Sequence, residues 1–268
     1  MPSSKTDTFR RLHESGCFVI PNPWDRGSAV FLAKSGFKAL ASSSAGFAWS
    51  QARPDNKVTV EQVLAHLHDL AEAVDVPINA DFEDGFAKEP ERVAANVTRA
   101  TGTGIAGLSI EDSTRDGGAP LYDLALAVER IKAARAAIDK SGTGVMLTAR
   151  AEGFLVGRPD VSEVIRRLEA FAAAGADCLF APGLNKKEDV AAVVKAVAPK
   201  PVNLIVVKPW ITLREAADLG VRRISVGGAL ARAAWAGFAK AAREIADHGT
   251  FNAFAGNDPP LNLNAMFS

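Results

Sequence analysis

Short apolar runs and longer amphipathic stretches alternate along most of the chain. The short runs are rich in β-branched and other apolar residues, which is typical of strands. We expect eight of them, at Cys17–Ile20, Ala39–Ser43, Pro77–Asp81, Gly107–Glu111, Gly144–Ala149, Cys178–Ala181, Val202–Val207 and Arg222–Val226. The last six are mostly continuous apolar runs, as expected for strands that are buried on both faces of a parallel sheet.

Between the expected strands, apolar residues recur at the spacing of an amphipathic helix. The expected helices are Val60–Val74, Pro90–Thr101, Leu124–Lys140, Val161–Ala174, Lys187–Val197, Leu213–Leu219 and Ala231–Ala246. Gly36, Gly175 and Gly220 lie where a helix must stop before the next strand begins.

Eight strands that alternate with helices, without a linker, predict an α/β protein with one (β/α)₈ TIM barrel over residues 1–268. An open doubly wound sheet is the main competitor. It is typically marked by a Gly-x-Gly-x-x-Gly turn after the first strand, and the sequence has none there. The tail at about 252–268 does not fit the alternation, so we expect an irregular arm, which would pack on a neighbouring subunit.

The composition agrees with a single barrel and excludes several classes of partner. The chain has 268 residues, 48% of them hydrophobic, and a barrel needs about 250. Its 31 basic and 31 acidic residues balance, without a basic stripe, which argues against nucleic acid and anionic membranes. No apolar run reaches a membrane span of about 18 residues. Two cysteines and a polar N-terminus lead us to expect a cytoplasmic protein.

Acidic residues gather at the carboxyl ends of neighbouring strands, where barrel enzymes place their active sites. Asp81 and Glu83 are two residues apart, so both side chains point to one face of the strand. Glu111 ends the next strand. Several acids in one mouth repel one another unless they take up protons or share a cation, and oxygen ligands suit Mg²⁺ or Mn²⁺. The alternative is that the acids cap the following helices.

Arg150 ends the fifth expected strand, beside these acids. A guanidinium next to a metal can clamp a carboxylate, phosphate or phosphonate through two hydrogen bonds. The alternative is a plain salt bridge to Glu111 or Glu152. The turn Ser42–Gly46 after the second strand can direct backbone N–H groups and hydroxyls at an anion.

In combination and order, five segments resemble the isocitrate lyase/phosphoenolpyruvate mutase superfamily, in particular its carboxyphosphonoenolpyruvate mutase-like branch. The resemblance covers roughly residues 10–235. The segments are Pro21–Asp25, Ser43–Ser50 with Pro54 and Asp55, Ala80–Phe86, Ser109–Asp112 and Thr148–Arg150.

The resemblance implies a homo-oligomer, a dimer or tetramer, in which the last barrel helix is exchanged between subunits. It also implies Mg²⁺ that chelates the carboxylate and oxo oxygens of a small 2-oxo acid. It assigns Asp81 and Glu111 to the metal shell and Asp55 to a metal contact through water. The substrate-binding residues it implies are Trp24, Ser43, Ser44, Ala45, Gly46, Asp81 and, at the far end of the substrate, Arg150.

The chain departs from the family pattern at two places. Many members have an acid at the position of Asn79, and Glu83, two residues further out from Asp81, is expected to take over its metal or catalytic role. The lyases carry a cysteine in the loop after the fourth strand, whereas Ser113–Pro120 has neither cysteine nor lysine. This argues against cleavage of isocitrate or methylisocitrate. Cys17 and Cys178 fall at strand starts, at the opposite end of the barrel.

The sequence therefore predicts a Mg²⁺-dependent lyase or decarboxylase that cleaves a C–C or P–C bond of a small 2-oxo or 2-hydroxy acid through an enolate. Arg150, Glu111, Asp55 and Glu83 are the expected catalytic residues, with a proton from water, Glu83 or Glu152. His66 and His68 are expected to be solvated.

Four alternatives stay open. The first is a phosphonomutase that acts on a phosphoenolpyruvate-like substrate. The second is a Schiff-base aldolase that uses Lys208. The third is an isomerase barrel with a phosphate cradle at Ser225–Ala229. The fourth is a barrel that binds a small carboxylate without catalysis.

Overall fold

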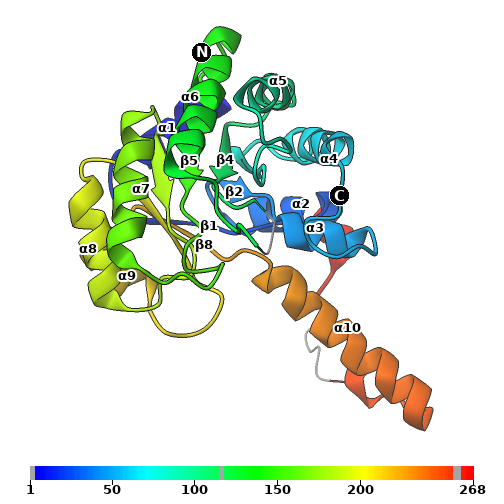
Figure 1. Ribbon diagram of the computed structural model, residues 1–268. Helices are drawn as coiled ribbons and strands as arrows, with labels where there is room; N and C mark the ends of the chain where they lie inside the picture. Colours follow the sequence, from blue (N-terminus) through cyan, green and yellow to red (C-terminus); the bar gives the residue numbers. More distant parts are fainter. Residues whose placement is uncertain (1–3, 115–117, 256–260) are drawn as a thin grey trace.

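In the computed structural model, which describes residues 4–114, 118–255 and 261–268, eight parallel strands form a nearly closed barrel (Figure 1). The strands are β1 (Phe18–Ile20), β2 (Leu40–Ala41), β3 (Ile78–Asp81), β4 (Gly107–Glu111), β5 (Met146–Arg150), β6 (Cys178–Phe180), β7 (Val202–Ile205) and β8 (Arg223–Ser225). Their order in the sheet is β1-β8-β7-β6-β5-β4-β3-β2. All eight expected strands are confirmed, and the open doubly wound sheet is excluded.

Helices alternate with the strands, and most of them cover the outside of the barrel. They are α1 (Lys5–Leu12), α2 (Arg26–Lys34), α3 (Ser44–Ser50), α4 (Val60–Ala73), α5 (Pro90–Thr101), α6 (Leu124–Ser141), α7 (Val161–Ala173), α8 (Lys187–Val197), α9 (Leu213–Asp218), α10 (Ala229–His248) and α11 (Leu263–Phe267), with a 3₁₀ turn at Asn252–Phe254. The seven expected helices are confirmed. Among the described residues, no helix is long and apolar enough to cross a membrane.

The first and last strands of the sheet meet through a short seam. The Ala41 N–H donates to the Pro21 carbonyl at 3.0 Å. The Asn22 side chain spans the same seam: its Oδ1 accepts the N–H groups of Val226 and Gly227, each at 2.9 Å, and its Nδ2 donates to the Ser42 carbonyl at 3.0 Å. A buried amide thus supplies hydrogen bonds where β1 and β2 are too short to pair as regular strands.

Helix α1, which the sequence pattern did not predict, closes the amino-terminal end of the barrel. Its Phe9 is fully buried among the inward-facing side chains of Ile20, Ala41 and Met146. A Cβ on Gly107 would lie 2.6 Å from the Phe9 ring, so glycine is required where the plug enters. Among the described residues, α1 thus closes this end, and the cavity opens toward the carboxyl end, where the predicted acids lie.

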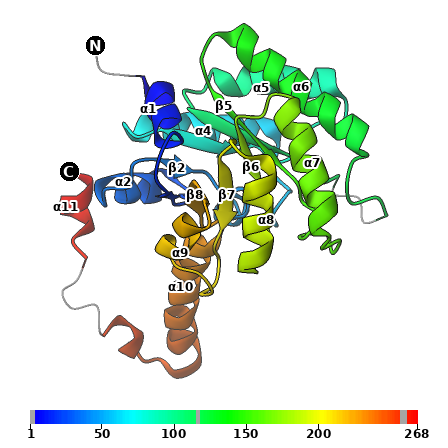
Figure 2. The same ribbon diagram turned by 90° about the vertical axis from the view of Figure 1, so that its left-hand side faces the viewer.

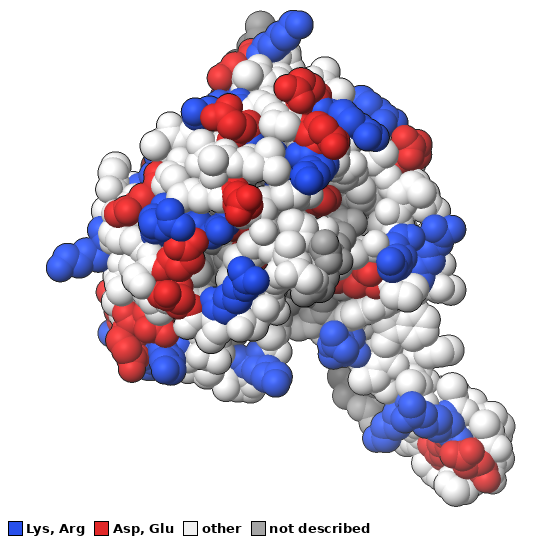
Figure 3. Space-filling view, viewed as in Figure 1, with Lys and Arg blue, Asp and Glu red and all other residues white. Residues whose placement is uncertain are grey.

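Helix α10 behaves differently from the other barrel helices, because it points away from the barrel (Figures 1 and 2). Within α10 only Ala231 is buried, whereas Trp235, Phe238 and Ile245 are 43%, 63% and 39% exposed. The tail, expected to be irregular, contains α11. Its Met266 carbonyl accepts a hydrogen bond from Lys34 of α2 at 2.6 Å. Basic and acidic side chains are interspersed on the face drawn in Figure 3.

Candidate functional site

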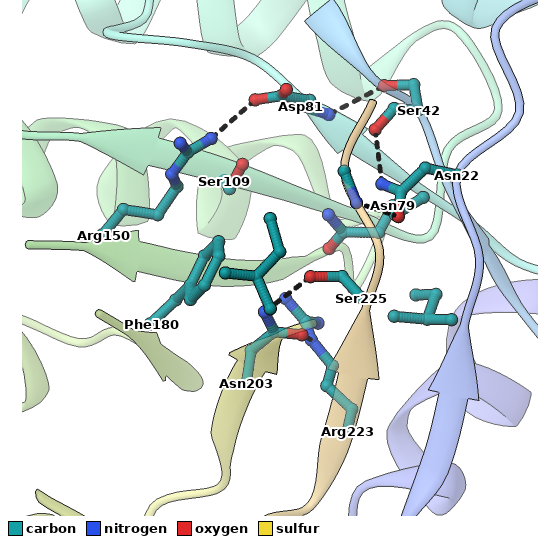
Figure 4. A pocket seen from close by; sticks show the side chains of 14 residues that line it. Asn22, Ser42, Asn79, Asp81, Ser109, Arg150, Phe180, Asn203, Arg223 and Ser225 are labelled. Atoms are coloured by element: carbon teal, nitrogen blue, oxygen red, sulfur yellow. Dashed lines mark hydrogen bonds and ion pairs between the residues drawn. The ribbon is translucent and has the colours of Figure 1, made fainter. Parts of the chain in front are cut away.

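A polar cavity of about 140 Å³ lies inside the barrel (Figure 4). Asp81 and Arg150 line it toward the carboxyl ends of the strands, and Asn203 and Arg223 line its deeper part. The remaining lining side chains come from neighbouring strands and the loops that follow them, and they are Ile20, Asn22, Ala41, Ser42, Asn79, Ser109, Phe180, Ile205, Ser225 and Gly227. Alternate residues of each strand point inward, which is why residues two apart recur in this lining.

Arg150 holds three carboxylates together at the mouth of the cavity. Its Nη1 lies 2.8 Å from Asp81 Oδ1, its Nη2 lies 3.2 Å from Glu111 Oε2, and its Nε lies 2.9 Å from Glu152 Oε1. The three acids raise the pKa of Arg150 against the opposing effect of its burial, which is the largest single cause. The salt-bridge alternative for Arg150 is thus present in the structure, and it involves both Glu111 and Glu152. A ligand that binds Arg150 has to compete with these acids.

The serine turn lies directly against Asp81. The Ser44 N–H donates to Asp81 Oδ2 at 3.0 Å, and the Ser42 hydroxyl accepts the Asp81 N–H at 2.8 Å. Ser43 caps α3 by accepting the Gly46 N–H, and Ala45 follows in the first turn. A Cβ on Gly46 would lie 2.8 Å from the Trp24 Cβ, so the turn can approach this half-buried indole only with glycine there.

Asp55 belongs to the same cluster, although it lies in the loop after α3. The residue as a whole is exposed, but its carboxyl accepts a hydrogen bond from Ser44. Burial of the carboxyl and, secondly, the Asp81 charge raise the pKa of Asp55, while Ser44 and Arg150 lower it. The negative charges of Asp55 and Asp81 therefore repel one another.

Glu152 is a buried acid whose acidity is strongly altered. It is 4% exposed, and burial raises its pKa to about 8; Arg150 opposes the shift, and the charges of Glu111 and Asp112 add to it. Its N–H donates to Asp112 Oδ1 at 2.8 Å, and Asp112 is in turn paired with Arg167 at 3.0 Å. A buried network thus fixes the segment that carries Arg150 and Glu152.

Glu83 is less well placed than its position in the sequence suggested. It is 1% exposed and its backbone has a left-handed φ of 50°. It is not among the described residues that line the cavity. The turn of the chain after Asp81 breaks the strict alternation of a strand, so the two-residue spacing no longer keeps both side chains on one face.

The structure also places the residues behind the alternative functions. Lys208 is exposed in the bend after β7 and is not among the described lining residues. At the predicted phosphate cradle, the N–H groups of Val226 and Gly227 are already bound by Asn22. Ser113 donates to Glu111 Oε1 at 2.8 Å. The predicted loop positions Arg115, Asp116 and Gly117 lie outside the described residues.

The prediction for His66 was wrong. It is 8% exposed and stacks on Phe47 with ring centroids 4.0 Å apart, and burial lowers its pKa to about 4. The helical spacing carried a signal for this, because His66 lies three residues after Val63 and four before Leu70, which are both on the buried face of α4. His68 has a side chain that is 58% exposed, in agreement with its prediction.

The mouth fits a divalent cation that keeps much of its water. Among the described residues, no three acidic, histidine or cysteine side chains already converge as a metal centre, because Arg150 lies between the acids. Asp55 and Asp81 nevertheless repel one another, and a cation near both would relieve that repulsion. Mg²⁺ is commonly held by one or two carboxylates with several waters, so the donor set is of the right kind.

Comparisons with known proteins agree with this geometry. The family model described as phosphoenolpyruvate phosphomutase matches residues 9–246. A candidate lyase/mutase from Burkholderia cenocepacia J2315 is 44% identical, with a TM-score of 0.95 over 98% of this chain and 96% of that one. An uncharacterized protein of Mycobacterium tuberculosis H37Rv is 32% identical over 90% of this chain and 89% of its own length.

A structure of oxaloacetate acetylhydrolase with the product oxalate is 28% identical, with a TM-score of 0.87 over 98% of this chain and 94% of that one. Other relatives are named as oxaloacetate decarboxylase, 2-methylisocitrate lyase and 2,3-dimethylmalate lyase. The relatives thus include lyases, hydrolases, decarboxylases and mutases that act on small acids.

Proposed function

The chain belongs to the phosphoenolpyruvate mutase/isocitrate lyase superfamily, and from this premise we propose that it is a Mg²⁺-dependent lyase or decarboxylase. Its substrate would be a small 2-oxo or 2-hydroxy acid whose C–C bond breaks to leave an enolate. One observation carries the proposal: Arg150 gathers Asp81, Glu111 and Glu152 at a cavity mouth, where the Ser44 N–H reaches Asp81. The kinship with oxaloacetate acetylhydrolase and oxaloacetate decarboxylase supports this substrate class.

Asp81 and Glu111 would hold the cation, with Asp55 acting through water. When bound, Mg²⁺ would supply positive charge to stabilise the negative charge that develops on the enolate oxygen. Of the acids predicted for this role, Glu83 has the weakest support, since its left-handed backbone breaks the strand alternation that turns Asp81 toward the cavity.

Substrate orientation would come from opposite sides of the mouth. The turn Ser43–Gly46 would hold one carboxylate of the substrate, and Arg150 would hold the far acidic end. Fixed donors on both sides would hold the substrate with its breaking bond perpendicular to the plane of the forming enolate. Such positioning lowers the activation barrier. Trp24 packs against this turn, so we place it as a support of the turn and a wall of the entrance.

Glu152 would supply the proton that completes the reaction. In a decarboxylation, the electron pair of the C–C bond stays on the substrate as CO₂ leaves, and the resulting enolate must gain one proton. Burial raises the pKa of Glu152 to about 8, so its protonated form would be available to donate that proton and to recover one from water. Asp112, tied to Arg167 and to the Glu152 N–H, would keep the segment in place.

We further propose that α10 is exchanged with a second copy of the chain, as the resemblance implies. The support is its apolar face, where Trp235, Phe238 and Ile245 are exposed. Light scattering should then show a dimer or tetramer, and charged substitutions at Trp235 and Phe238 should release monomers. A wild-type protein that is monomeric at micromolar concentration would contradict the exchange.

The function is tested by a substrate screen with Mg²⁺ and, separately, with EDTA. The panel contains oxaloacetate, substituted malates, phosphonopyruvate, carboxyphosphonoenolpyruvate and methylisocitrate. We expect Mg²⁺-dependent C–C cleavage of an oxaloacetate-like or malate-like acid at about 1 s⁻¹ or faster, and no cleavage of methylisocitrate. Binding of these acids without turnover of any of them would identify a carboxylate-binding barrel instead. Turnover of the two phosphonates alone would identify a phosphonomutase or phosphonate hydrolase.

A further inference from the structure

The floor of the cavity contains a second buried arginine, Arg223 of β8, which is 3% exposed. Its Nε donates to Asn203 Oδ1 at 2.8 Å, its Nη1 lies 3.2 Å from His13 Nε2, and its Nη2 donates to Thr148 Oγ1 at 3.1 Å. Figure 4 shows Arg223 and Asn203 at the deep end of the pocket and Arg150 and Asp81 at the other. Arg223 is thus a wall of the same cavity as Arg150.

All three acceptors of Arg223 are uncharged. Asn203 and Thr148 carry no charge. His13 Nδ1 lies 2.8 Å from the Phe9 carbonyl, which can only accept, so Nδ1 carries the proton and Nε2 accepts from Arg223. Burial and the Arg223 charge lower the pKa of His13 to about 3, so it is neutral at physiological pH. Among the described residues, no carboxylate forms an ion pair with Arg223.

An arginine in this position cannot lose its charge, because its guanidinium stays protonated in proteins. A buried cation without a counter-charge is costly, and proteins normally pair it. The guanidinium has five N–H donors, and the three contacts above use three of them. Two donors and the whole positive charge are therefore left at the edge of a cavity.

We propose that the floor of the cavity is an anion site, in which Arg223 binds one small anionic group that enters from the mouth. The chemistry is that of a single carboxylate or halide: the guanidinium supplies charge, and the neighbouring Asn203 and Ser225, joined by a 3.0 Å hydrogen bond, supply polar edges. Helix α1 blocks entry from the amino-terminal end of the barrel, which its Phe9 fills.

The cavity has the right size for such an occupant. One water molecule occupies about 30 Å³ of liquid, so about 140 Å³ holds a halide with a few waters or the end of a short dicarboxylate. Two sources of the anion are consistent with this volume: a free inorganic ion, or a carboxylate of the substrate that reaches down from the mouth. A halide site does not depend on the proposed reaction. Occupation by a carboxylate of the substrate does depend on it.

Bromide tests the site directly, because it scatters anomalously. Crystals of the wild type soaked in sodium bromide should show an anomalous peak beside Arg223. The peak should vanish in Arg223→Met and persist in Arg222→Met, a matched control, because Arg222 is the half-buried neighbour whose guanidinium donates to the Gly16 carbonyl outside the cavity. In solution, replacing gluconate by bromide at constant ionic strength should raise the wild-type melting midpoint by about 2–4 °C, with no rise in Arg223→Met.

Calorimetric titration distinguishes the two sources without requiring turnover. If the substrate supplies the anion, Arg223→Met weakens malonate binding at least about tenfold, and malonate displaces the bromide peak. If a free ion is the natural occupant, bromide binds and the Arg223→Met change leaves malonate affinity unaltered. The proposal is overturned if wild-type crystals show only water beside Arg223 and malonate affinity does not depend on Arg223. That result leaves the proposed lyase activity untouched, because the activity is measured separately.

Discussion

Arg150 and Arg223 are two buried arginines in one cavity, and their surroundings are opposite. Arg150 at the mouth has three carboxylate partners within 3.2 Å, whereas the contacts of Arg223 at the floor are an amide, an imidazole and a hydroxyl. The acids at the mouth thus more than balance the charge of Arg150, whereas the charge of Arg223 has no counter-charge among the described residues. We propose that the same residue type holds an acidic cluster together in one place and binds an anion in the other.

We expect the largest difference between the two arginines in the stability and turnover of their methionine variants. Arg150→Met leaves buried carboxylates without their cation, and breaking such a group destabilises proteins by about 3–5 kcal/mol. We also expect the turnover of the identified substrate to fall about 10²–10³-fold, the scale of a lost electrostatic contact at a reacting centre. Arg223→Met removes a buried cation that lacks a counter-charge but leaves its neutral acceptors without their donor, so we expect a smaller loss of about 1–3 kcal/mol.

Urea unfolding of both variants measures this difference. A loss of stability in Arg223→Met as large as that in Arg150→Met would show that the floor arginine also has a charged partner in the protein. Such a result would remove the contrast between the two ends of the cavity.

Glu152 should make both stability and activity at the mouth depend on pH. Its pKa is raised in the folded protein, so the folded state keeps a proton that the unfolded chain releases above about pH 4.3. The stability that this proton contributes is complete at low pH and is lost as the pH rises toward about 8. Activity that depends on the protonated acid should decline over the upper part of the same range.

Glu152→Gln should flatten the dependence of stability on pH between about 5 and 8 and lower turnover about 10²-fold, the lower end for a lost general acid. The alkaline decline of the activity profile should disappear with it. Chemical unfolding at several pH values and a kcat profile measure the two effects. An unchanged alkaline limb in Glu152→Gln would assign the proton to another group.

Substitution of Asp81 tests whether the mouth of the cavity binds the metal ion. Asp81→Ala should weaken Mn²⁺ binding at least about tenfold, which corresponds to about 1.4 kcal/mol. Asp69→Ala is a matched control, because Asp69 is half exposed and pairs only with the exposed Arg26 in the described structure. Calorimetric titration of Mn²⁺ into both folded variants measures their affinities. Equal Mn²⁺ affinities in the two variants would show that Asp81 is not a ligand of the cation.

Lys208 should show the smallest effect. It is exposed outside the described lining of the cavity, so Lys208→Ala should change turnover less than about twofold, an effect below 0.5 kcal/mol that is typical of surface substitutions. Borohydride added with an accepted 2-oxo acid should leave the mass of the protein unchanged. A reduced adduct on Lys208 would place the enzyme in the Schiff-base class.

Much of the barrel was predictable because strands that are buried on both faces leave a plain apolar signal. The position of the mouth acids was also predictable, since Asp81, Glu111 and Arg150 end adjacent strands, and parallel strands end at the same edge. A salt bridge of Arg150 to Glu111 or Glu152 was only the alternative prediction, and its ion pair with Asp81 was not predicted.

The floor was not predictable from local patterns. Arg223 contacts His13, which is 210 residues away in the sequence, and α1 is a short polar-looking segment whose burial depends on the finished barrel. Asn22 similarly joins β1, the loop after β2 and the loop after β8, a contact that exists only once the sheet has curved. The burial of His66 depends on Phe47 in another helix. Glu83 was misplaced because the chain turns directly after β3, where a two-residue period no longer applies.

Proton exchange of pyruvate in D₂O tests the central claim most directly, because it follows the enolate without knowledge of the leaving group. The methyl signal of pyruvate is recorded by ¹H NMR with the protein and Mg²⁺, after calorimetry has established that pyruvate binds. We predict Mg²⁺-dependent loss of the signal that is abolished by EDTA and by Asp81→Ala, and slowed in Glu152→Gln. No loss of signal beyond that in Mg²⁺ buffer alone, with pyruvate and Mg²⁺ bound, would contradict an enolate-forming site at this mouth.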